Sequence, residues 1–531
     1  MPTANSSARV GRPRSITPTD GRFITLTSGM NQRYQAAPEV VYLPESSEQV
    51  RVAVGESATA GNRISVHSGG HCFEDFVFNP EVEAVVDLSA MNGVYFDSDH
   101  QAFAVEAGAR LLDVYERLYL GWGVTLPGGL CYSVGAGGHV AGGGYGLLSR
   151  QHGLTVDHLY GVEVVVVDAE GRARLVTATR EHTDPNRDLW WGHTGGGGGN
   201  FGIVTRYLFR SPGAVGEPPE LLPQPPDEVL LNAVSLPWEE LNREALTTLL
   251  GNFTGWYSEH SEPRTREAAL SGMLMLNHSS NGHIGMLTQV DAGVTGAEDL
   301  LREHLERVLA GTGVTPRPMN APVGEFAPMP ELADTRRLSW LRAVRMIGTN
   351  TPYLTDPTLR GEHKSAYGRN RVPDSRASVL YDHLTAPSPN NPNSMLVVMS
   401  YGGAINTVGT SQTASAQRDS HYKLLYQAFW QHEEEDAENI AWVRSLYERT
   451  YADSGGVPVP DEFSDGCYVN YPDVDLGDER HNRSGKAWHD LYYKDNYPRL
   501  QQVKARWDPG DVFRHSQSVR LPGGTDDEHC E

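Results

Sequence analysis

Residues 126–147 read LPGGLCYSVGAGGHVAGGGYGL, and this glycine-rich stretch decides how the rest of the chain is interpreted. It contains one cysteine, Cys131, and one histidine, His139. A cysteine flanked by so much glycine has few neighbouring side chains to pack against, which weakens the usual assignment of a lone cysteine as a small buried hydrophobe. A nucleophilic or adduct-forming thiol is the alternative, and the stretch by itself leaves both interpretations open.

Two other glycine clusters lie in the N-terminal part of the chain. Ser68, Gly69, Gly70 and His71 follow a predicted strand, and residues 197–202 read GGGNFG. The second cluster formally satisfies the GxGxxG dinucleotide fingerprint, but residues 203–209 after it predict a β-branched and aromatic strand. No helix N-terminus then follows to receive a pyrophosphate, so a Rossmann fold is excluded. Consecutive glycines still expose backbone N–H groups, so contact with a phosphate or a flavin remains open.

Composition excludes several classes of protein. The chain has 531 residues, with 44 Lys and Arg against 67 Asp and Glu, so its formal charge is -23 and its surface repels nucleic acid and anionic membranes. No run approaches the 18 apolar residues of a membrane span. The four cysteines lack the paired spacing of a zinc site, and we predict no metal. Residues 1–20 predict a disordered tail without a signal peptide, which favours a cytoplasmic protein.

Strand and helix patterns alternate along the chain. The sequence predicts strands at 39–43, 84–88, 162–167, 230–236 and 395–401, and helices at 47–60, 238–257, 297–309 and 420–430, with a further helix starting in the acidic run 432–438. Residues 211–226 are rich in proline and glutamate, as in a linker between lobes. We therefore expect an α+β chain divided near residue 212.

The glycine clusters belong to a larger set of motifs. The set comprises residues 68–71, the Cys131 block, residues 188–202, 401–404 and 468–473, and an ending at 496–500, 503–504, 508–509, 512–513 and 517–519. From about residue 31 to 522 the chain resembles the berberine-bridge-enzyme-like flavin oxidases of the vanillyl-alcohol oxidase and p-cresol methylhydroxylase superfamily. The phrases at 71–76, 119–122 and 455–460 most resemble bacterial oxidases that tailor natural products, including glycopeptide hexose oxidases. One departure is His67, where many members have arginine.

The resemblance implies a fold and a cofactor. It implies a two-lobed FAD-binding fold of the PCMH type, with an FAD-binding domain at 21–212, a substrate-binding domain at 213–455 and a C-terminal segment at 456–531 that returns to the first domain. It further implies that FAD is bound covalently through His71 and Cys131. The other residues expected to contact FAD are Ser68, Gly69, Gly70, Gly135, Gly137, Gly138, His139, Gly142, Gly143, Tyr145, Gly202, Val204, Tyr468 and Asn470.

Oxidation of an alcohol carbon needs a general base for the hydroxyl proton. By resemblance, Tyr468 and Tyr471 of the Tyr-x-Asn-Tyr motif lie on the substrate side of the flavin. On an extended strand the two would face opposite sides, so the sequence leaves open which one is the base. A tyrosine needs a partner to act at neutral pH, and the candidates are Tyr145, Lys364 and Tyr367. We expect Trp340, Tyr381 and Tyr401 to line the substrate pocket.

The implied reaction is hydride transfer from an alcohol, hemiacetal or sugar carbon of a natural product to flavin N5, with O2 reduced to H2O2. The expected partners are a small-molecule substrate, which could be glycosylated, and molecular oxygen. Two alternatives stay open: an oxidase of free oligosaccharides, and a flavoprotein retained as a non-redox cyclase or binding module. A general base at Tyr468 or Tyr471 argues against the non-redox alternative.

Overall fold

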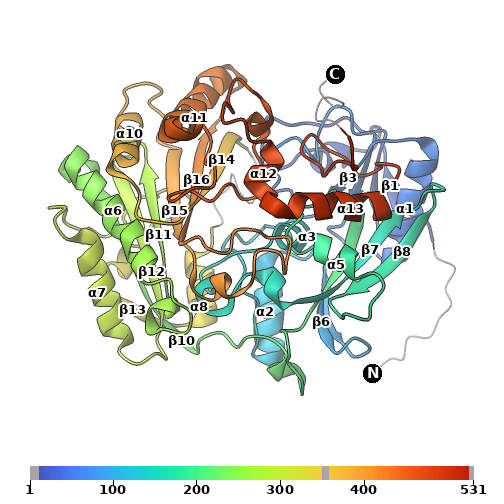
Figure 1. The fold of residues 1–531 in the computed structure, drawn as a ribbon, viewed down its shortest axis with the longest axis horizontal. Coiled ribbons are helices and arrows are strands. Elements are labelled where there is room, and N and C mark those ends of the chain that lie inside the picture. The colour runs from blue at the N-terminus through green and yellow to red at the C-terminus, as the bar shows by residue number, and fades with distance from the viewer. Residues whose placement is uncertain (1–10, 350–357, 525–531) are drawn as a thin grey trace.

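The computed structural model describes residues 11–349 and 358–524, and three sheets organise this part of the chain (Figure 1). The first sheet has the order β1-β2-β4-β3, with β1 at Arg14–Ile16, β2 at Val40–Leu43, β4 at Ala84–Asp87 and β3 at Ile64–His67. The second has the order β5-β6-β9-β7-β8, with β5 at Val94–Asp97, β6 at Ala102–Glu106, β9 at Ile203–Phe209, β7 at Leu159–Val167 and β8 at Ala173–Thr179. Both sheets belong to the first lobe, with the blue and teal segments of Figure 1.

Local sequence determines where the helix between β2 and β3 begins and ends. Helix α1 spans Ser47–Ala60, as predicted, because Ser46 accepts a hydrogen bond from the Gln49 backbone and Gly61 adopts the left-handed conformation that ends a helix. It buries Val50 and Val54 against the first lobe. The other helices of this lobe are α2 (Leu111–Trp122), α3 (Ala136–Ala141), α4 (Ser149–His152) and α5 (Arg187–Gly192).

The second lobe is built on a seven-stranded antiparallel sheet. Its order is β13-β10-β12-β11-β15-β16-β14, with β13 at Arg336–Ser339, β10 at Glu228–Pro237, β12 at His283–Asp291, β11 at Leu270–Asn277, β15 at Ser394–Ser400, β16 at Tyr422–Trp430 and β14 at Arg360–Gly368. Helices α6 (Arg243–Glu259), α7 (Ala297–Leu309) and α10 (Asp374–Leu384) cover its outer face, and α11 (Asp436–Thr450) packs beside β16 (Figure 1). A shorter helix, α8 (Trp340–Ile347), contacts α2 of the first lobe. The two-lobed α+β prediction is confirmed.

The prediction of a helix at 420–430 was wrong, because Tyr422–Trp430 form the strand β16. This strand pairs with β14 on one side and β15 on the other, and all nine of its residues are buried. A strand buried on both faces is apolar at nearly every position, so its sequence does not show the alternation that would distinguish it from a buried helix. The correction matters because it places Lys423 on a strand facing the first lobe.

Both ends of the described chain contact the first lobe. Residues 1–10 lie outside the described ranges, but Arg14–Ile16 of the expected disordered tail form β1 and pair with β2 through backbone hydrogen bonds. Near its C-terminal end the chain first pairs Ser464 with Gly368 of the second lobe and then reaches α12 (Trp488–Tyr493) and α13 (Tyr497–Trp507), of which α13 contacts α5 of the first lobe (Figure 1). Lys504 Nζ donates to the carbonyl of Asn200, 3.0 Å away. None of the helices in the described ranges has the length and apolar composition needed to span a bilayer.

A buried arginine joins the two lobes. Arg150, on α4, is fully buried, and its guanidinium donates to backbone carbonyls of the second lobe, including Leu270 at 2.9 Å and His260 at 2.6 Å. The same guanidinium lies 5.0 Å from the ring centroid of Tyr257 on α6. Carbonyl dipoles and an aromatic face thus solvate this cation, so the lobes are held together where the cavity begins.

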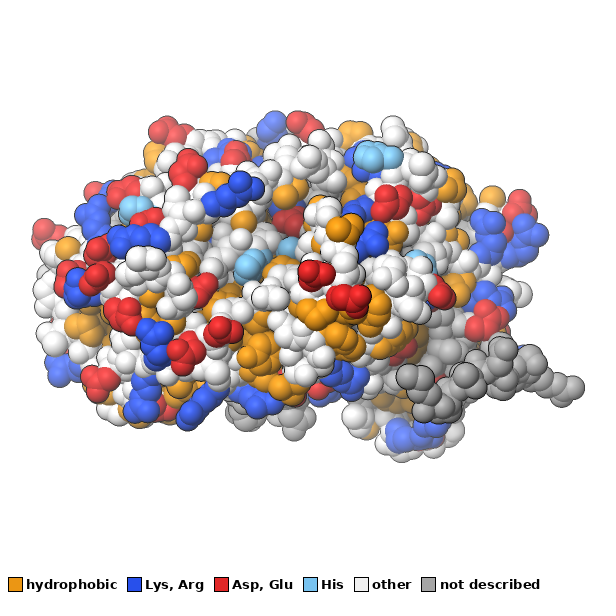
Figure 2. All heavy atoms as spheres, turned by 90° about the horizontal axis from the view of Figure 1, so that it is seen from below, with side chains coloured by type: hydrophobic (Ala, Val, Ile, Leu, Met, Phe, Trp, Pro, Cys, Tyr) orange, Lys and Arg blue, Asp and Glu red, His pale blue; other side chains and the backbone are white. Residues whose placement is uncertain are grey.

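The molecular surface carries charges of both signs. On the face shown in Figure 2, acidic and basic side chains alternate over most of the area, and hydrophobic side chains gather near its centre. The excess of acidic residues is therefore not concentrated on this face.

Candidate active site

A cavity of about 340 Å³ lies between the glycine segments of the first lobe and the inner face of the seven-stranded sheet. Its first-lobe wall comes from residues 68–73, 129–147 and 197–204, and its second-lobe wall includes Met273, Val397, Met399, Lys423 and Leu425. The C-terminal part adds Tyr468 to Pro472, His515 and Gln517. Three regions far apart in sequence therefore meet in one cavity.

Close packing explains two of the glycines, Gly69 and Gly135. A Cβ atom on Gly69 would lie 2.2 Å from the Gly135 nitrogen, and one on Gly135 would lie 2.1 Å from Ser68 Oγ. Side chains at these positions would force the two segments apart. Ser68 Oγ donates to the Ala107 carbonyl at 2.6 Å and fixes the same contact. The glycines therefore bring the His71 segment and the Cys131 segment together.

His71 and Cys131 both face the cavity and share a neighbour. His71 Nε2 lies 2.8 Å from Ser133 Oγ, and Cys131 Sγ lies 3.7 Å from the same oxygen. Burial lowers the pKa of His71 to about 4, so its imidazole is neutral at pH 7 and carries a free lone pair. Burial raises the pKa of the Cys131 thiol. The two residues are thus placed to hold one group between them.

Two glycines of the wall have no such packing reason. A Cβ atom on Gly138 or Gly198 would meet no atom within 4 Å, and neither residue has a positive φ. Gly138 lies inside α3, where glycine costs roughly 0.5–1 kcal/mol relative to alanine. Both positions line the cavity, so the open space beside each backbone belongs to the cavity, and a Cβ would fill it. A flat, phosphate-bearing group such as FAD fits this wall, because it requires bare backbone close to its own atoms.

Most of the predicted cofactor contacts line the cavity. These are Ser68, Gly69, Gly70, His71, Cys131, Gly135, Gly137, Gly138, His139, Tyr145, Gly202, Val204, Tyr468 and Asn470. Gly142 and Gly143 do not line it. A Cβ on Gly142 would lie 2.0 Å from Asn470 Oδ1, and one on Gly143 would lie 2.7 Å from Ser415 Oγ. These two glycines instead make room for neighbouring side chains.

Tyr468 and Tyr471 point to the same side, contrary to the extended-strand expectation. The Tyr471 backbone N–H donates to the Tyr468 carbonyl at 2.9 Å, which closes a turn between them. Their ring centroids lie 5.0 Å apart, and both rings line the cavity. Asn470 Nδ2 donates to the Tyr468 hydroxyl at 3.2 Å and to the His139 carbonyl at 3.0 Å. Asn470 therefore ties Tyr468 to helix α3.

Lys423 lines the cavity but was not predicted from the sequence. Its Nζ lies 3.8 Å from the ring centroid of Tyr468, 4.4 Å from that of Tyr145 and 4.8 Å from that of Tyr471. Lys423 is 1% exposed, and within the described residues its Nζ has no hydrogen-bond partner. Burial lowers its pKa well below the usual value. A lysine inside an otherwise apolar run was the available signal, and assigning that run to a helix concealed it.

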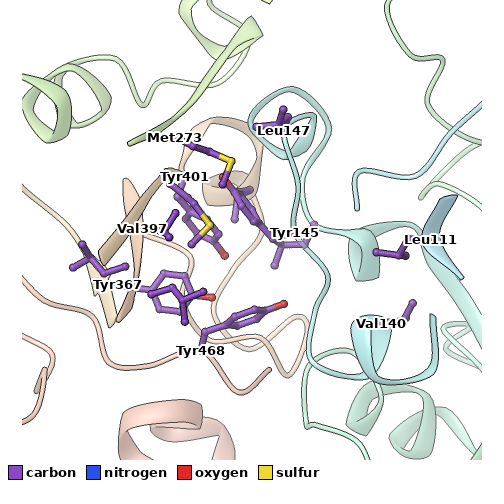
Figure 3. Packing of buried hydrophobic residues seen from close by; sticks show 14 of the residues in the cluster. Leu111, Val140, Tyr145, Leu147, Met273, Tyr367, Val397, Tyr401 and Tyr468 are labelled. Carbon is purple, nitrogen blue, oxygen red and sulfur yellow. The ribbon is translucent and has the colours of Figure 1, made fainter. Parts of the chain in front are cut away.

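Of the other proposed partners of the tyrosine base, Tyr145 and Tyr367 lie in the cluster of aromatic rings (Figure 3) and Lys364 does not. Figure 3 shows the rings of Tyr145, Tyr367, Tyr401 and Tyr468 turned toward one another at the edge of the seven-stranded sheet. The Tyr367 and Tyr468 centroids are 6.0 Å apart, whereas Tyr145 donates its hydroxyl proton to the Ser400 carbonyl. Lys364 does not belong to this cluster, because its Nζ donates to Asp473 at 2.7 Å and to Asp475 at 2.6 Å.

The predicted substrate-pocket aromatics do not line the cavity. Trp340 packs against Tyr119, with ring centroids 5.3 Å apart, and Tyr381 packs against Trp238. The Tyr401 hydroxyl donates to the Gln417 carbonyl, 3.2 Å away. The inner wall is instead formed by side chains that alternate along β11, β15 and β16, which a sequence without strand assignments does not identify.

Other residues of the cavity were also missed. His193, His515 and Gln517 line it beside residues 197–200, and Glu325 lines it from the second lobe. Burial lowers the pKa of His515 to about 3 and raises the pKa of Glu325. His67, in contrast, lies outside the lining and contacts Asp87, with 3.0 Å between Nδ1 and Oδ2.

One carboxylate cluster deserves comparison with a metal site. Glu362, Asp473 and Asp475 bring carboxylate oxygens within 4.8 Å of one another. Lys364 Nζ donates to both aspartates and lies 3.8 Å from Glu362. Lys364, together with Arg444 on Asp475 and Arg33 on Glu362, thus supplies the positive charge that a metal ion would otherwise provide.

Comparisons with known proteins agree with this geometry. The family described as "FAD binding domain" matches residues 38–175, and "Berberine and berberine like" matches residues 467–520. An aclacinomycin-N/aclacinomycin-A oxidase from Streptomyces galilaeus is 48% identical over 95% of this chain and 89% of its own length. A hexose oxidase from Chondrus crispus is 33% identical over 94% and 93%.

Solved structures give the same result. An aclacinomycin oxidoreductase superposes with a TM-score of 0.89 at 47% identity, covering 96% of this chain and all (100%) of the other. A glycopeptide hexose oxidase complexed with teicoplanin has a TM-score of 0.89 at 42% identity, covering 96% and 99%. These matches span both lobes and the C-terminal segment. The chain therefore belongs to the berberine-bridge-enzyme-like family of FAD-linked oxidases, and resembles its bacterial members that act in natural-product biosynthesis.

Proposed function

We propose that this protein oxidises an alcohol, hemiacetal or sugar carbon of a natural product, with O2 as the electron acceptor and H2O2 as the second product. The observation that carries the proposal is the environment of Tyr468. Its hydroxyl accepts a hydrogen bond from Asn470, and Lys423 Nζ lies 3.8 Å from its ring centroid, inside the cavity that His71 and Cys131 line. This arrangement suits removal of a proton from a substrate hydroxyl.

Tyr468 is the general base of the proposed reaction. Burial raises its pKa to about 12, and the hydrogen bond from Asn470 acts in the opposite direction. Burial disfavours a charge on Lys423 alone, but a protonated Lys423 and a Tyr468 phenolate stabilise each other, because opposite charges attract strongly where water is excluded. Tyr471 lies farther from Lys423, at 4.8 Å. The proton of Tyr145 is already committed to the Ser400 carbonyl.

FAD, when bound, supplies the acceptor for the hydride at N5 and passes the two electrons to O2. His71 and Cys131 are the residues proposed to hold it covalently. The neutral imidazole of His71 keeps Nε2 against Ser133, which leaves Nδ1 available for a bond to the cofactor. Two covalent bonds would retain the cofactor in a cleft wide enough for a large substrate.

The substrate class follows from the relatives and the wall of the cavity. The names of similar proteins refer to aclacinomycins, to hexoses and to a glycopeptide antibiotic. The second-lobe wall is mostly apolar, with Met273, Val397, Met399 and Leu425. An apolar wall beside a proton acceptor suits a hydrophobic aglycone that carries a sugar. The proposed substrates are therefore glycosylated natural products rather than free oligosaccharides.

Intact mass and H2O2 release test the proposal together. The samples are wild type, His71→Ala, Cys131→Ala and the double variant, each measured after acid denaturation. We expect FAD mass on the wild type and on each single variant, and none on the double variant. Wild type should release H2O2 with aclacinomycin A or a glycopeptide. FAD that dissociates from denatured wild type would refute the double attachment, and a flavoprotein that binds such compounds without H2O2 release would favour a non-redox function.

A further inference from the structure

Glu325 is the one carboxylate side chain among the residues that line the cavity in the described part of the chain. It lies in the connection between α7 and β13, where Val323 and Phe326 exchange two backbone hydrogen bonds of 3.2 Å. Both flanking side chains are buried, at 1% and 3% exposed. A Cβ on Gly324 would lie 2.4 Å from Met275 Sδ, so glycine allows this turn to sit directly on the sheet. The turn therefore holds Glu325 in a fixed place.

A buried glutamine orients the carboxyl group. Gln427 Nε2, on β16, donates to Glu325 Oε1 at 3.0 Å. Gln427 is fully buried, and its Oε1 has no partner within the described residues. Burying an amide that is only half satisfied is costly. Its contact with Glu325 is the evident reason for a glutamine at this position, so the pair is built to present a carboxyl group to the cavity.

The pair lies along the sheet from Lys423. Lys423 and Gln427 are four residues apart on one face of β16, which corresponds to about 13 Å along the strand. The wall between them carries Leu425, with Val397 on the neighbouring strand. The Glu325 carboxyl is also close enough to Tyr471 and Cys131 to raise the pKa of each, so it faces the same cavity as the proposed reaction centre.

We infer that Glu325 binds a hydrogen-bond donor of the substrate, a hydroxyl or a protonated amine, on a part of the molecule other than the reacting carbon. An ionised carboxyl group offers acceptors only, and a donating ligand stabilises that ionised form against the burial that raises its pKa. The inference rests on the proposed function, because it assigns a role in substrate binding at the same site. It adds that a substrate must reach both the reaction centre and Glu325, which a single free hexose does not.

Glu325→Gln tests this role, with Glu331→Gln as the matched control. The control makes the same chemical change at an exposed position nearby in the same connection. The probes are aromatic glycosides that bear either hydroxyl or amino sugars, with glucose and glucosamine as single-ring comparisons. Dissociation constants come from the change in flavin absorbance on binding, and KM and kcat come from H2O2 release.

We expect Glu325→Gln to weaken binding of hydroxyl-bearing glycosides about 10-fold and of amino glycosides about 100-fold, because a charge-assisted hydrogen bond is the stronger one. The kcat, the covalent FAD mass and the behaviour of the single-ring sugars should not change. Equal affinity of wild type and variant, failure of wild type to bind any glycoside, or loss of FAD mass would overturn the inference. Glycosides that bind wild type without H2O2 release would contradict the proposed function instead.

Discussion

Lys423 Nζ lies 3.8 Å from the ring centroid of Tyr468. Lys423 is on strand β16, and Tyr468 lies 45 positions later in a loop. The lysine is buried without a hydrogen-bond partner in the described structure, so its main neighbours are aromatic faces. Burial disfavours a charge on the lysine by itself, and the charged form becomes favourable when one of the tyrosines loses its proton. The lysine therefore couples the charge of the site to the proposed proton transfer.

Replacing Lys423 with methionine should slow oxidation and shift its pH dependence. Without the nearby positive charge the Tyr468 phenolate is less stable, so its pKa rises. We expect kcat to fall about 100-fold at pH 7, and the ascending limb of the pH–rate profile to move up by about 1–2 units. Steady-state H2O2 release between pH 6 and 10 measures both. Lys486→Met, at an exposed position, serves as the control. An unchanged pH profile in Lys423→Met would remove the lysine from the mechanism.

Alanine at Gly138 should exclude the cofactor without harming the fold. A methyl group there meets no protein atom within 4 Å, and alanine stabilises α3 by roughly 0.5–1 kcal/mol. We expect a thermal midpoint equal to or above that of wild type when both are compared without cofactor, together with a reduced ratio of FAD to protein. Gly55→Ala, in the interior of α1, should keep its FAD. Full FAD incorporation in Gly138→Ala would show that FAD does not occupy the space beside Gly138.

Alanine at Gly142 should have the opposite pattern. Its Cβ would lie 2.0 Å from Asn470 Oδ1, so Asn470 must move and its hydrogen bond to Tyr468 is lost. Gly142 does not line the cavity, so FAD should remain attached. We expect kcat to fall about 10- to 100-fold, because one hydrogen bond to a charged group contributes about 1.5–3 kcal/mol. Intact mass and H2O2 release on one preparation measure both quantities, and a loss of FAD would indicate a wider disturbance.

Replacing Arg150 with methionine should weaken the contact between the lobes and lower the free energy of unfolding. The substitution removes the donors that satisfy the carbonyls of Leu270 and His260, which remain buried. We expect a loss of about 3–5 kcal/mol in the free energy of unfolding, measured from urea denaturation. Arg302→Met, at an exposed ion pair, should change it by no more than about 0.5 kcal/mol. A small effect at Arg150 would mean that the lobes are held by packing alone.

Mild acid should destabilise the protein through its buried histidines. Burial lowers the pKa of His193 to about 4 and that of His304 to about 3, below about 6.5 in the unfolded chain. The unfolded state then binds more protons, so stability is fully present above pH 6.5 and is lost as the pH falls toward 4. At pH 5 each histidine lowers the free energy of unfolding by about 2 kcal/mol relative to pH 7.5. Urea midpoints at the two pH values measure this loss, and His304→Phe should reduce it.

The sequence by itself determined a good deal of this protein. The glycine clusters, with His71 and Cys131 among them, predicted segments that line the cavity, and Ser46 and Gly61 marked the ends of α1. These features are local: a cap, a turn or a close backbone approach depends on a few adjacent residues. The two-lobed α+β fold followed from such local patterns and from the family resemblance.

Only the tertiary structure decided the chemistry at the far wall of the cavity. Whether residues 420–430 form a strand depends on pairing with β14 and β15, and that pairing directs Lys423 toward Tyr468. A turn between Tyr468 and Tyr471 places both rings in the cavity, and it does not follow from their spacing. Glu325 reaches the site through packing of its turn on the sheet. Contacts between segments tens of residues apart are not encoded in any local pattern, because sheet pairing and burial are properties of the folded chain.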